Sequence, residues 1–149
     1  NKMTPEQWDV VIKTNLYSIF NTTKQVYDGM VVRGWGRIIN ISSVNGIKGQ
    51  AGQSNYSATK AAIYGFNKSL AAECAKKGVT VNSISPGYIG TDMVRAIRED
   101  VLQKIVATVP IGRLGEPSEI ARTVAFLSAD DAGLITGEDI TVNGGLYYR

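Results

Sequence analysis

The sequence of 149 residues has no histidine, one cysteine and no apolar run that approaches membrane-spanning length. Without histidine, a Ser-His-Asp triad, a Cys-His pair and every His-bearing metal site are excluded, and we expect no metal ion. Cys74 cannot form an internal disulfide, and its place in the pattern favours a small helix residue over a nucleophile. Any proton transfer must therefore use tyrosine, lysine, a carboxyl group, the thiol or water.

The chain also lacks a strong excess of one charge. Charged residues make up 19% of the chain, apolar residues 44%, and the formal net charge is +3. This composition is typical of a globular domain with a substantial core, and the scattered lysines and arginines indicate a solvated surface and not a nucleic-acid interface. No signal-peptide pattern opens the chain. We expect a cytoplasmic protein that contacts neither nucleic acid nor membrane.

A serine, a tyrosine and a lysine form the most informative pattern. A predicted buried strand over 37–42 is followed by Ser43, and a predicted alanine-rich helix over 54–77 carries Tyr56. Lys60 comes four residues later, so the phenol and the ammonium share a helix face. A nearby positive charge favours an ionised phenol, which makes Tyr56 a usable general acid or base. Ser43 can supply a second hydroxyl.

The other elements are predicted from apolar periodicity and from helix-stop residues. A helix over 5–33 begins with a capping box formed by Thr4 and Gln7. Asn15 inside it is either a tolerated surface residue or the mark of a local kink that frees a backbone carbonyl. A strand, a long helical crossover and a second strand form a parallel unit. The remaining expectations are a loop over 43–54, a strand over 79–85, one or two short helices over 93–109, a helix over 117–127 and a strand over 140–142.

The spacing Ser-x12-Tyr-x3-Lys of Ser43, Tyr56 and Lys60 resembles the catalytic core of the short-chain dehydrogenase/reductase family. Asn15, 41 residues before Tyr56, and Pro86-Gly87 after the next strand match the same family pattern. Within the family, the chain resembles the bacterial acetoacetyl-CoA reductases and 3-oxoacyl-ACP reductases. The resemblance implies an α/β fold with a Rossmann-type doubly wound parallel sheet, and reduction of a short 3-oxoacyl thioester by a nicotinamide cofactor.

The resemblance also implies a role for each matched residue. Tyr56 would donate the proton, Ser43 would polarise the carbonyl, Lys60 would also hold the nicotinamide ribose, and Asn15 would organise a relay water. Cofactor contacts are expected from Tyr56, Lys60, Pro86, Gly87, the backbone of Ile89 and the hydroxyl of Thr91. We expect NADPH, with NADH as the alternative, and a homotetramer.

Substrate contacts are expected from Ser43 and from the loop before Tyr56. Gln50 and Gln53 offer two amides there, and Tyr88 faces the same crevice. Such groups suit a short 3-oxo thioester and tilt the choice toward acetoacetyl-CoA over a carrier-protein substrate. Cations near a presumed lid over 93–109 either meet the phosphates of coenzyme A or are solvated surface charges. These cations are Arg95, Arg98 and Lys104.

One feature of a dinucleotide fold is missing. The glycine-rich turn that receives the pyrophosphate follows the first strand of such a fold, and no glycine here stands in the spacing Gly-x3-Gly-x-Gly after a strand. We therefore interpret residues 1–149 as the C-terminal part of a single Rossmann-fold domain, whose other part carries further parallel strands. A non-catalytic fragment that keeps the motif residues by descent is the rival interpretation.

Overall fold

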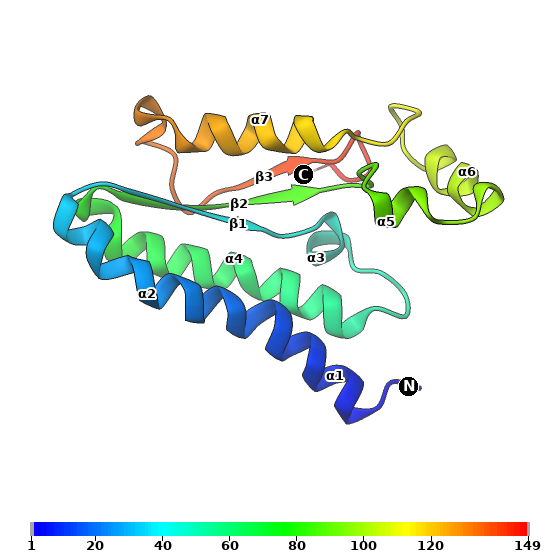
Figure 1. Ribbon diagram of the computed structural model, residues 1–149, viewed down its shortest axis with the longest axis horizontal. Coiled ribbons are helices and arrows are strands. Elements are labelled where there is room, and N and C mark those ends of the chain that lie inside the picture. The colour runs from blue at the N-terminus through cyan, green and yellow to red at the C-terminus, as the bar shows by residue number, and fades with distance from the viewer. Residues whose placement is uncertain (1, 149) are drawn as a thin grey trace.

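The computed structural model describes residues 2–148, which form three layers (Figure 1). A parallel sheet in the order β1-β2-β3 is the middle layer. Helices α2 and α4 lie on one side of it and α7 on the other. The predicted α/β class with a parallel, Rossmann-type sheet is confirmed. The bounds of these elements are β1 Gly36–Ile41, β2 Val79–Pro86, β3 Asp139–Val142, α2 Ser18–Arg33, α4 Ser54–Cys74 and α7 Pro117–Ser128.

The central strand β2 is buried along its length up to Ser85, because helices cover both faces of the sheet. The core between the sheet and the helices α2 and α4 contains Ile38, Val79, Val81 and Cys74. Burial raises the pKa of the Cys74 thiol, which is fully enclosed. Cys74 is therefore a packing residue, as its sequence context indicated.

The helix predicted over 5–33 is present, and every residue in that range is helical, but its hydrogen-bond pattern changes partway along. Helix α1 (Pro5–Ile12) is followed by a π-helical segment, η1 (Lys13–Tyr17), before α2 begins. The predicted capping box is present: the Thr4 hydroxyl accepts from the Gln7 N–H, and the Gln7 side chain accepts from the Thr4 N–H. The π segment contains Asn15, so a local irregularity of the helix does occur at this residue.

The predicted loop over 43–54 is also partly wrong, because residues 44–48 form a short helix, α3 (Val44–Lys48). Ser43 caps it, and Gly49 ends it with a positive φ of 73°. Helix α4 ends at Cys74 and is followed by a 3₁₀ turn, η2 (Ala75–Lys77). The predicted short helices are α5 (Asp92–Arg95) and α6 (Glu99–Ala107), and a 3₁₀ turn, η3 (Asp130–Ala132), follows α7.

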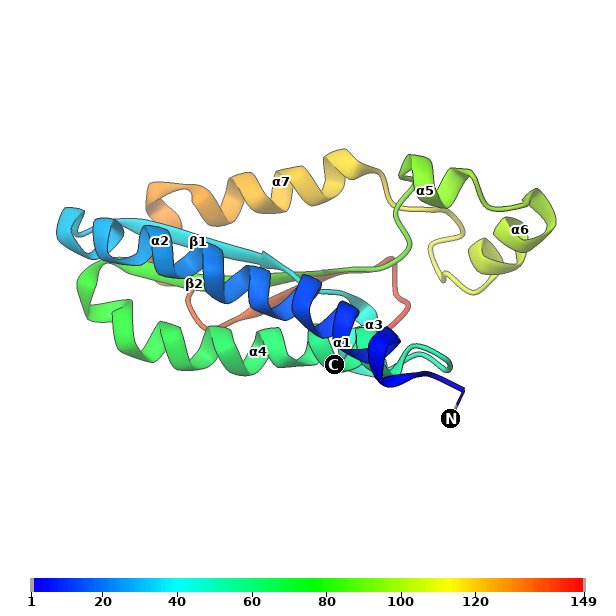
Figure 2. The ribbon, with the colours of Figure 1, turned by 60° about the horizontal axis from the view of Figure 1, so that its bottom comes forward.

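The three strands run in the same direction, and their carboxyl ends lie at one end of the molecule (Figure 1). Helices α3 and α5 lie at that end, and the first turns of α4 lie beside α3 (Figure 2). Ligands of open parallel sheets bind outside the carboxyl ends of the strands, so this end is where a site is expected. No helix within residues 2–148 is long and apolar enough to cross a membrane.

Candidate active site

Ser43 stands at the carboxyl end of β1, two residues after the strand ends. Its Oγ accepts a hydrogen bond from the Asn45 N–H at 3.1 Å, and this bond caps α3. The hydroxyl proton is not used in that contact and remains able to donate to a second group. The helix cap thereby fixes the oxygen of Ser43 while it leaves a donor for a ligand.

Tyr56 and Lys60 lie on one face of α4, as the i, i+4 spacing predicted. The Lys60 Nζ lies 5.6 Å from the centre of the Tyr56 ring and donates to the carbonyl oxygen of Ile41 at 2.8 Å. Burial lowers the pKa of Lys60 below its ordinary value of 10.5. A partly buried ammonium beside a phenol is an arrangement suited to proton transfer through the phenol.

Asn15 lies in the π-helical segment and faces α4. Its Nδ2 donates to the Thr59 Oγ1 at 3.4 Å, and the Thr59 hydroxyl donates to the Tyr56 carbonyl oxygen at 2.7 Å. Asn15 thus contacts Thr59, the residue that precedes Lys60 on α4, although Asn15 lies 45 positions before Lys60 in the chain. π-helical bulges are frequent at functional sites, and this one brings a polar side chain to the lysine-bearing helix.

The turn after β2 approaches the rest of the chain closely. A Cβ at Gly87 would lie 2.8 Å from the Asn143 Cα and 2.9 Å from the Asn143 carbonyl oxygen, so only glycine fits. The Gly115 N–H donates to the Tyr88 carbonyl oxygen at 2.9 Å, and Ile89 pairs with Gly115 in an isolated parallel bridge. These bonds hold the predicted cofactor-contacting turn after Pro86 in a defined position.

A cavity of about 430 Å³ at the carboxyl ends of the strands brings several predicted residues together. Ser43 and Tyr56 line it from one side, and Gly87 and Tyr88 line it from the next loop. Gln53 completes the predicted set, and its Oε1 accepts from the Asn45 Nδ2 at 3.3 Å. The cavity thus places a serine and a tyrosine side chain beside the same space, the arrangement that two hydroxyls need in order to bind one carbonyl oxygen.

The sequence analysis missed three residues that line this cavity. Val44 and Asn45 were assigned to a loop because a five-residue helix carries too little periodicity to be recognised. Met93 lies in α5 with 84% of its surface exposed, and no motif in the sequence indicated that it would line the cavity. The capping pattern Ser43-Val44-Asn45 was the one signal that could have identified α3.

Some predicted residues lie outside this cavity. The Gln50 Oε1 accepts from the Lys48 Nζ at 3.5 Å, and Gln50 does not line the cavity. The Thr91 Oγ1 caps α5 by accepting from the Val94 N–H at 3.4 Å. Asn15, Lys60, Pro86 and Ile89 also stand beyond its walls, although Lys60 adjoins Tyr56.

The arginines near α5 are paired with carboxylates. The Arg95 Nη2 lies 3.2 Å from a Glu116 oxygen, and the Arg98 Nη2 lies 2.7 Å from an Asp100 oxygen. Their exposed positions and these partners favour the interpretation as surface charges over dedicated phosphate contacts. Within residues 2–148, no group of three histidine, cysteine or acidic side chains is placed to hold a metal ion.

The donor set at the cavity fits the nicotinamide end of a dinucleotide. A phenol, an ammonium and the backbone of the turn at Gly87 lie at the carboxyl ends of neighbouring parallel strands. The ammonium and phenol can bind ribose hydroxyls, and a turn free of side chains allows a flat ring to approach. The turn that would receive the pyrophosphate is not contained in these 149 residues.

Three comparisons connect this geometry to known proteins. The family model described as "Enoyl-(Acyl carrier protein) reductase" matches residues 1–147. The chain is 64% identical over 146 residues to the acetoacetyl-CoA reductase of Cupriavidus necator, a match that covers 98% of this chain and 59% of the relative. It is 51% identical over 146 residues to the 3-oxoacyl-[acyl-carrier-protein] reductase of Vibrio cholerae, covering 98% of this chain and 60% of the relative.

The solved structures agree with these matches. The crystal structure of 3-oxoacyl-[acyl-carrier protein] reductase from Brucella melitensis superimposes with a TM-score of 0.94 at 38% identity, covering 99% of this chain and 56% of that one. The chain thus spans about three fifths of the length of the curated relatives that it matches. The family match over nearly all residues shows that the chain belongs to the short-chain dehydrogenase/reductase family.

Proposed function

We propose that the protein containing this chain reduces a short 3-oxoacyl thioester with a nicotinamide cofactor, and that its substrate is acetoacetyl-CoA. The observation that carries this proposal is the placement of Ser43 and Tyr56 around one cavity with Lys60 beside the tyrosine. The identity of 64% to an acetoacetyl-CoA reductase supports the choice of substrate. Reduction would give the 3-hydroxyacyl thioester.

The chain's own residues supply position, charge and a proton. The Ser43 hydroxyl donates a hydrogen bond to the substrate carbonyl oxygen, because its own oxygen is already held by the α3 cap. Tyr56 transfers its hydroxyl proton to the same oxygen as negative charge develops there. The adjacent Lys60 ammonium stabilises the phenolate that remains. The nicotinamide group, when bound, supplies the hydride to the carbonyl carbon.

Asn15 would support the return of a proton to Tyr56. Its hydrogen bond to Thr59 holds the amide beside the helix turn that carries Lys60. A water between the π-helical segment and the Lys60 ammonium could then pass protons from solvent toward the phenol. The half-buried position of Asn15 agrees with such a relay.

We propose NADPH as the cofactor, with NADH as the alternative. Pro86, Gly87, Ile89 and Thr91 would meet the nicotinamide carboxamide and the nearby phosphate, and Lys60 the ribose. Gln53 and Tyr88 would bind the second carbonyl of the substrate, with Gln50 reaching it after a side-chain rotation. The residues that select between NADPH and NADH do not occur in this sequence. Measuring kcat/KM of the completed protein with each cofactor would decide between them.

We also propose a homotetramer in the cytoplasm. The groove between α2 and α4 has a volume of about 460 Å³, and polar and charged residues line it together with the apolar side chains of Phe20, Tyr27, Phe66 and Leu70. Phe20 exposes 54% of its surface there. Apolar groups of this kind along two long helices suit packing between subunits, and the stretch over 146–148 could form a second contact.

The test uses a completed chain, in which the N-terminal part of the Cupriavidus necator relative precedes residues 1–149. We expect reduction of acetoacetyl-CoA with a higher kcat/KM than for longer 3-oxoacyl-CoAs or 3-oxoacyl-ACP. A preference for the carrier-protein thioester would favour the alternative of a fatty-acid-synthesis reductase, as in the Vibrio cholerae relative. A folded, cofactor-binding chain without reductase activity would favour the non-catalytic interpretation.

A further inference from the structure

Tyr64 occupies a central position that the proposed mechanism does not use. It lies on α4, four residues after Lys60 and eight after Tyr56, and is half-buried. Its hydroxyl donates to the carbonyl oxygen of Ser43 at 3.1 Å. The Ser85 Oγ on β2 lies 3.0 Å from the same phenol oxygen, so one side chain joins α4, β2 and the residue that follows β1.

The contact to Ser43 belongs to a series that ties α4 to three successive residues. The Lys60 Nζ donates to the Ile41 carbonyl oxygen at 2.8 Å. The Ser42 hydroxyl lies within reach of the Lys60 carbonyl oxygen, at 2.9 Å, and of the Tyr64 oxygen, at 3.0 Å. The Tyr64 bond is the member of this series that holds Ser43 itself.

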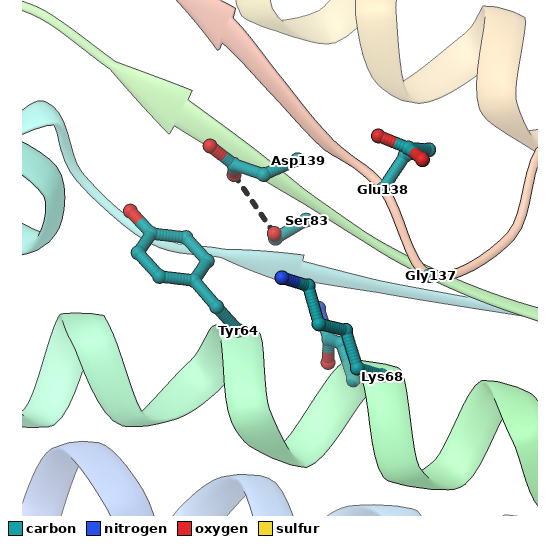
Figure 3. A pocket seen from close by; sticks show the side chains of 7 residues that line it. Tyr64, Lys68, Ser83, Gly137, Glu138 and Asp139 are labelled. Atoms are coloured by element: carbon teal, nitrogen blue, oxygen red, sulfur yellow. Dashed lines mark hydrogen bonds between the residues drawn. The ribbon is translucent and has the colours of Figure 1, made fainter.

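The serine beside the phenol belongs to a hydrogen-bonded cluster on β2 and β3. The Ser85 and Ser83 hydroxyls each lie 2.8 Å from the Asp139 Oδ1, and both serines are almost completely enclosed. Figure 3 shows Tyr64 rising from α4 toward β2 and β3, with Asp139 and Ser83 on the strands above it. A cavity of about 180 Å³ adjoins this cluster and is lined by Tyr64, so the ring has space on one side, and the contacts of its hydroxyl help to fix its position.

Resting on the proposed function, we infer that Tyr64 is a positioning residue that holds the Ser43 hydroxyl at the correct place relative to Tyr56. Ser43 and Tyr56 must reach one carbonyl oxygen, yet they stand on different elements. Tyr64 shares a rigid helix with Tyr56 and bonds directly to the backbone of Ser43, so it fixes the separation of the two hydroxyls. Displacement of a catalytic group by a fraction of an ångström lowers the rate even when binding is kept.

The decisive variant is Tyr64→Phe in the completed chain, since it removes the hydroxyl and keeps the ring. We expect kcat for acetoacetyl-CoA to fall about tenfold, the rate equivalent of one hydrogen bond, with KM within about twofold of the parent. The matched control is Tyr17→Phe, which removes the hydroxyl of a tyrosine that exposes 54% of its surface and lines neither the cavity nor the proposed subunit groove, and which should leave kcat unchanged. An unchanged kcat in Tyr64→Phe would overturn the inference.

A second background separates positioning from general destabilisation. The Ser43→Ala variant lacks the serine hydroxyl that Tyr64 is proposed to position. Adding Tyr64→Phe to this variant should therefore cause no further loss of kcat. The drop in melting temperature caused by Tyr64→Phe should be the same in both backgrounds. An equal fold-loss of kcat with and without Ser43 would mean that Tyr64 does not act through this serine.

A third measurement does not depend on activity. The Ser43 carbonyl oxygen also accepts from the Gly46 N–H at 2.9 Å, and Ser43 caps α3. Tyr64→Phe should therefore speed amide hydrogen exchange over residues 44–48 relative to Tyr17→Phe. If the completed chain proves inactive, the proposed function fails, but exchange still decides the positioning: unchanged protection of α3 would refute it.

Discussion

The ammonium of Lys60 lies 5.6 Å from the centre of the Tyr56 ring and is held there by a 2.8 Å hydrogen bond to the carbonyl oxygen of Ile41. The carbonyl belongs to the last residue of β1, so the strand that leads to Ser43 also orients the lysine. One strand end therefore fixes two of the three groups that the proposed chemistry needs. The following predictions depend on this geometry.

Tyr56→Phe in the completed chain should lower kcat by roughly 10²–10⁴-fold, the range typical of a lost general acid. The phenylalanine ring keeps the packing of α4, and the Lys60 ammonium remains to bind the ribose, so most of the cofactor affinity should be kept. Tyr17→Phe, which alters a phenol on a residue with 54% of its surface exposed, is the control. Steady-state turnover and a fluorescence titration of the cofactor measure the two effects, and near-normal turnover would show that Tyr56 is not the proton donor.

Lys60→Ala should damage turnover and cofactor binding together, because the proposed mechanism gives the ammonium two roles. Lys68→Ala removes an exposed ammonium from the same helix and should leave both unchanged. A cofactor titration measures the loss of cofactor affinity, and kcat measures the loss of turnover. A loss confined to kcat, with cofactor affinity intact, would remove the ribose contact from the proposal.

Gly87→Ala should destabilise the fold by about 1–3 kcal/mol and lower activity, since the new Cβ meets the Asn143 backbone at 2.8 and 2.9 Å. Gly65→Ala is the matched control, because a Cβ on that residue of α4 meets no atom within 4 Å. It should stabilise the helix by roughly 1 kcal/mol. Urea unfolding of both variants tests the contrast, and equal effects would contradict it.

The ionised carboxylate of Glu119 contributes to the free energy of unfolding, and this contribution is lost in acid. Its carboxylate accepts two hydrogen bonds from Arg113, each 2.8 Å long, and one from the Glu116 N–H, which lower its pKa from 4.5 to about 2. Because the folded pKa is depressed, this contribution is complete above about 4.5 and is lost as pH falls through about 2.

Glu119→Gln should therefore lower the free energy of unfolding at neutral pH, with a gap to the parent that closes between about pH 4.5 and 2. Glu99→Gln, at a carboxylate that accepts from the Gln103 side chain, is the control for charge removal. Denaturant titrations at several pH values measure the gap. A gap that stays constant across this range would show that the carboxylate charge is not what Arg113 stabilises.

The unpaired edge of β1 predicts the behaviour of the isolated chain. Within residues 2–148, β1 is an outer strand, and a groove of about 310 Å³ runs between it and α2. Exposed strand edges promote aggregation, so residues 1–149 alone should be poorly soluble or require a partner chain. The completed chain, with further strands beside β1, should be soluble. A monodisperse monomer of the isolated chain with a cooperative melt would contradict this prediction.

The sequence alone determined the class of fold and the central motif. Apolar strands joined by a long helical crossover predict a parallel sheet, and the spacing of Tyr56 and Lys60 places them on one helix face, since both patterns depend on local periodicity. The interruption at Asn15 was left as one of two alternatives. Helix α3 was missed, because five residues carry no readable period.

The tertiary structure alone decided which groups share the cavity. Gln53 lines it and Gln50 does not, although both stand in the same loop, because only the former faces Asn45 across the turn. The bond from Tyr64 to the Ser43 carbonyl joins residues 21 positions apart on two elements. No local pattern encodes such a contact, since it forms only when α4 packs against the ends of β1 and β2.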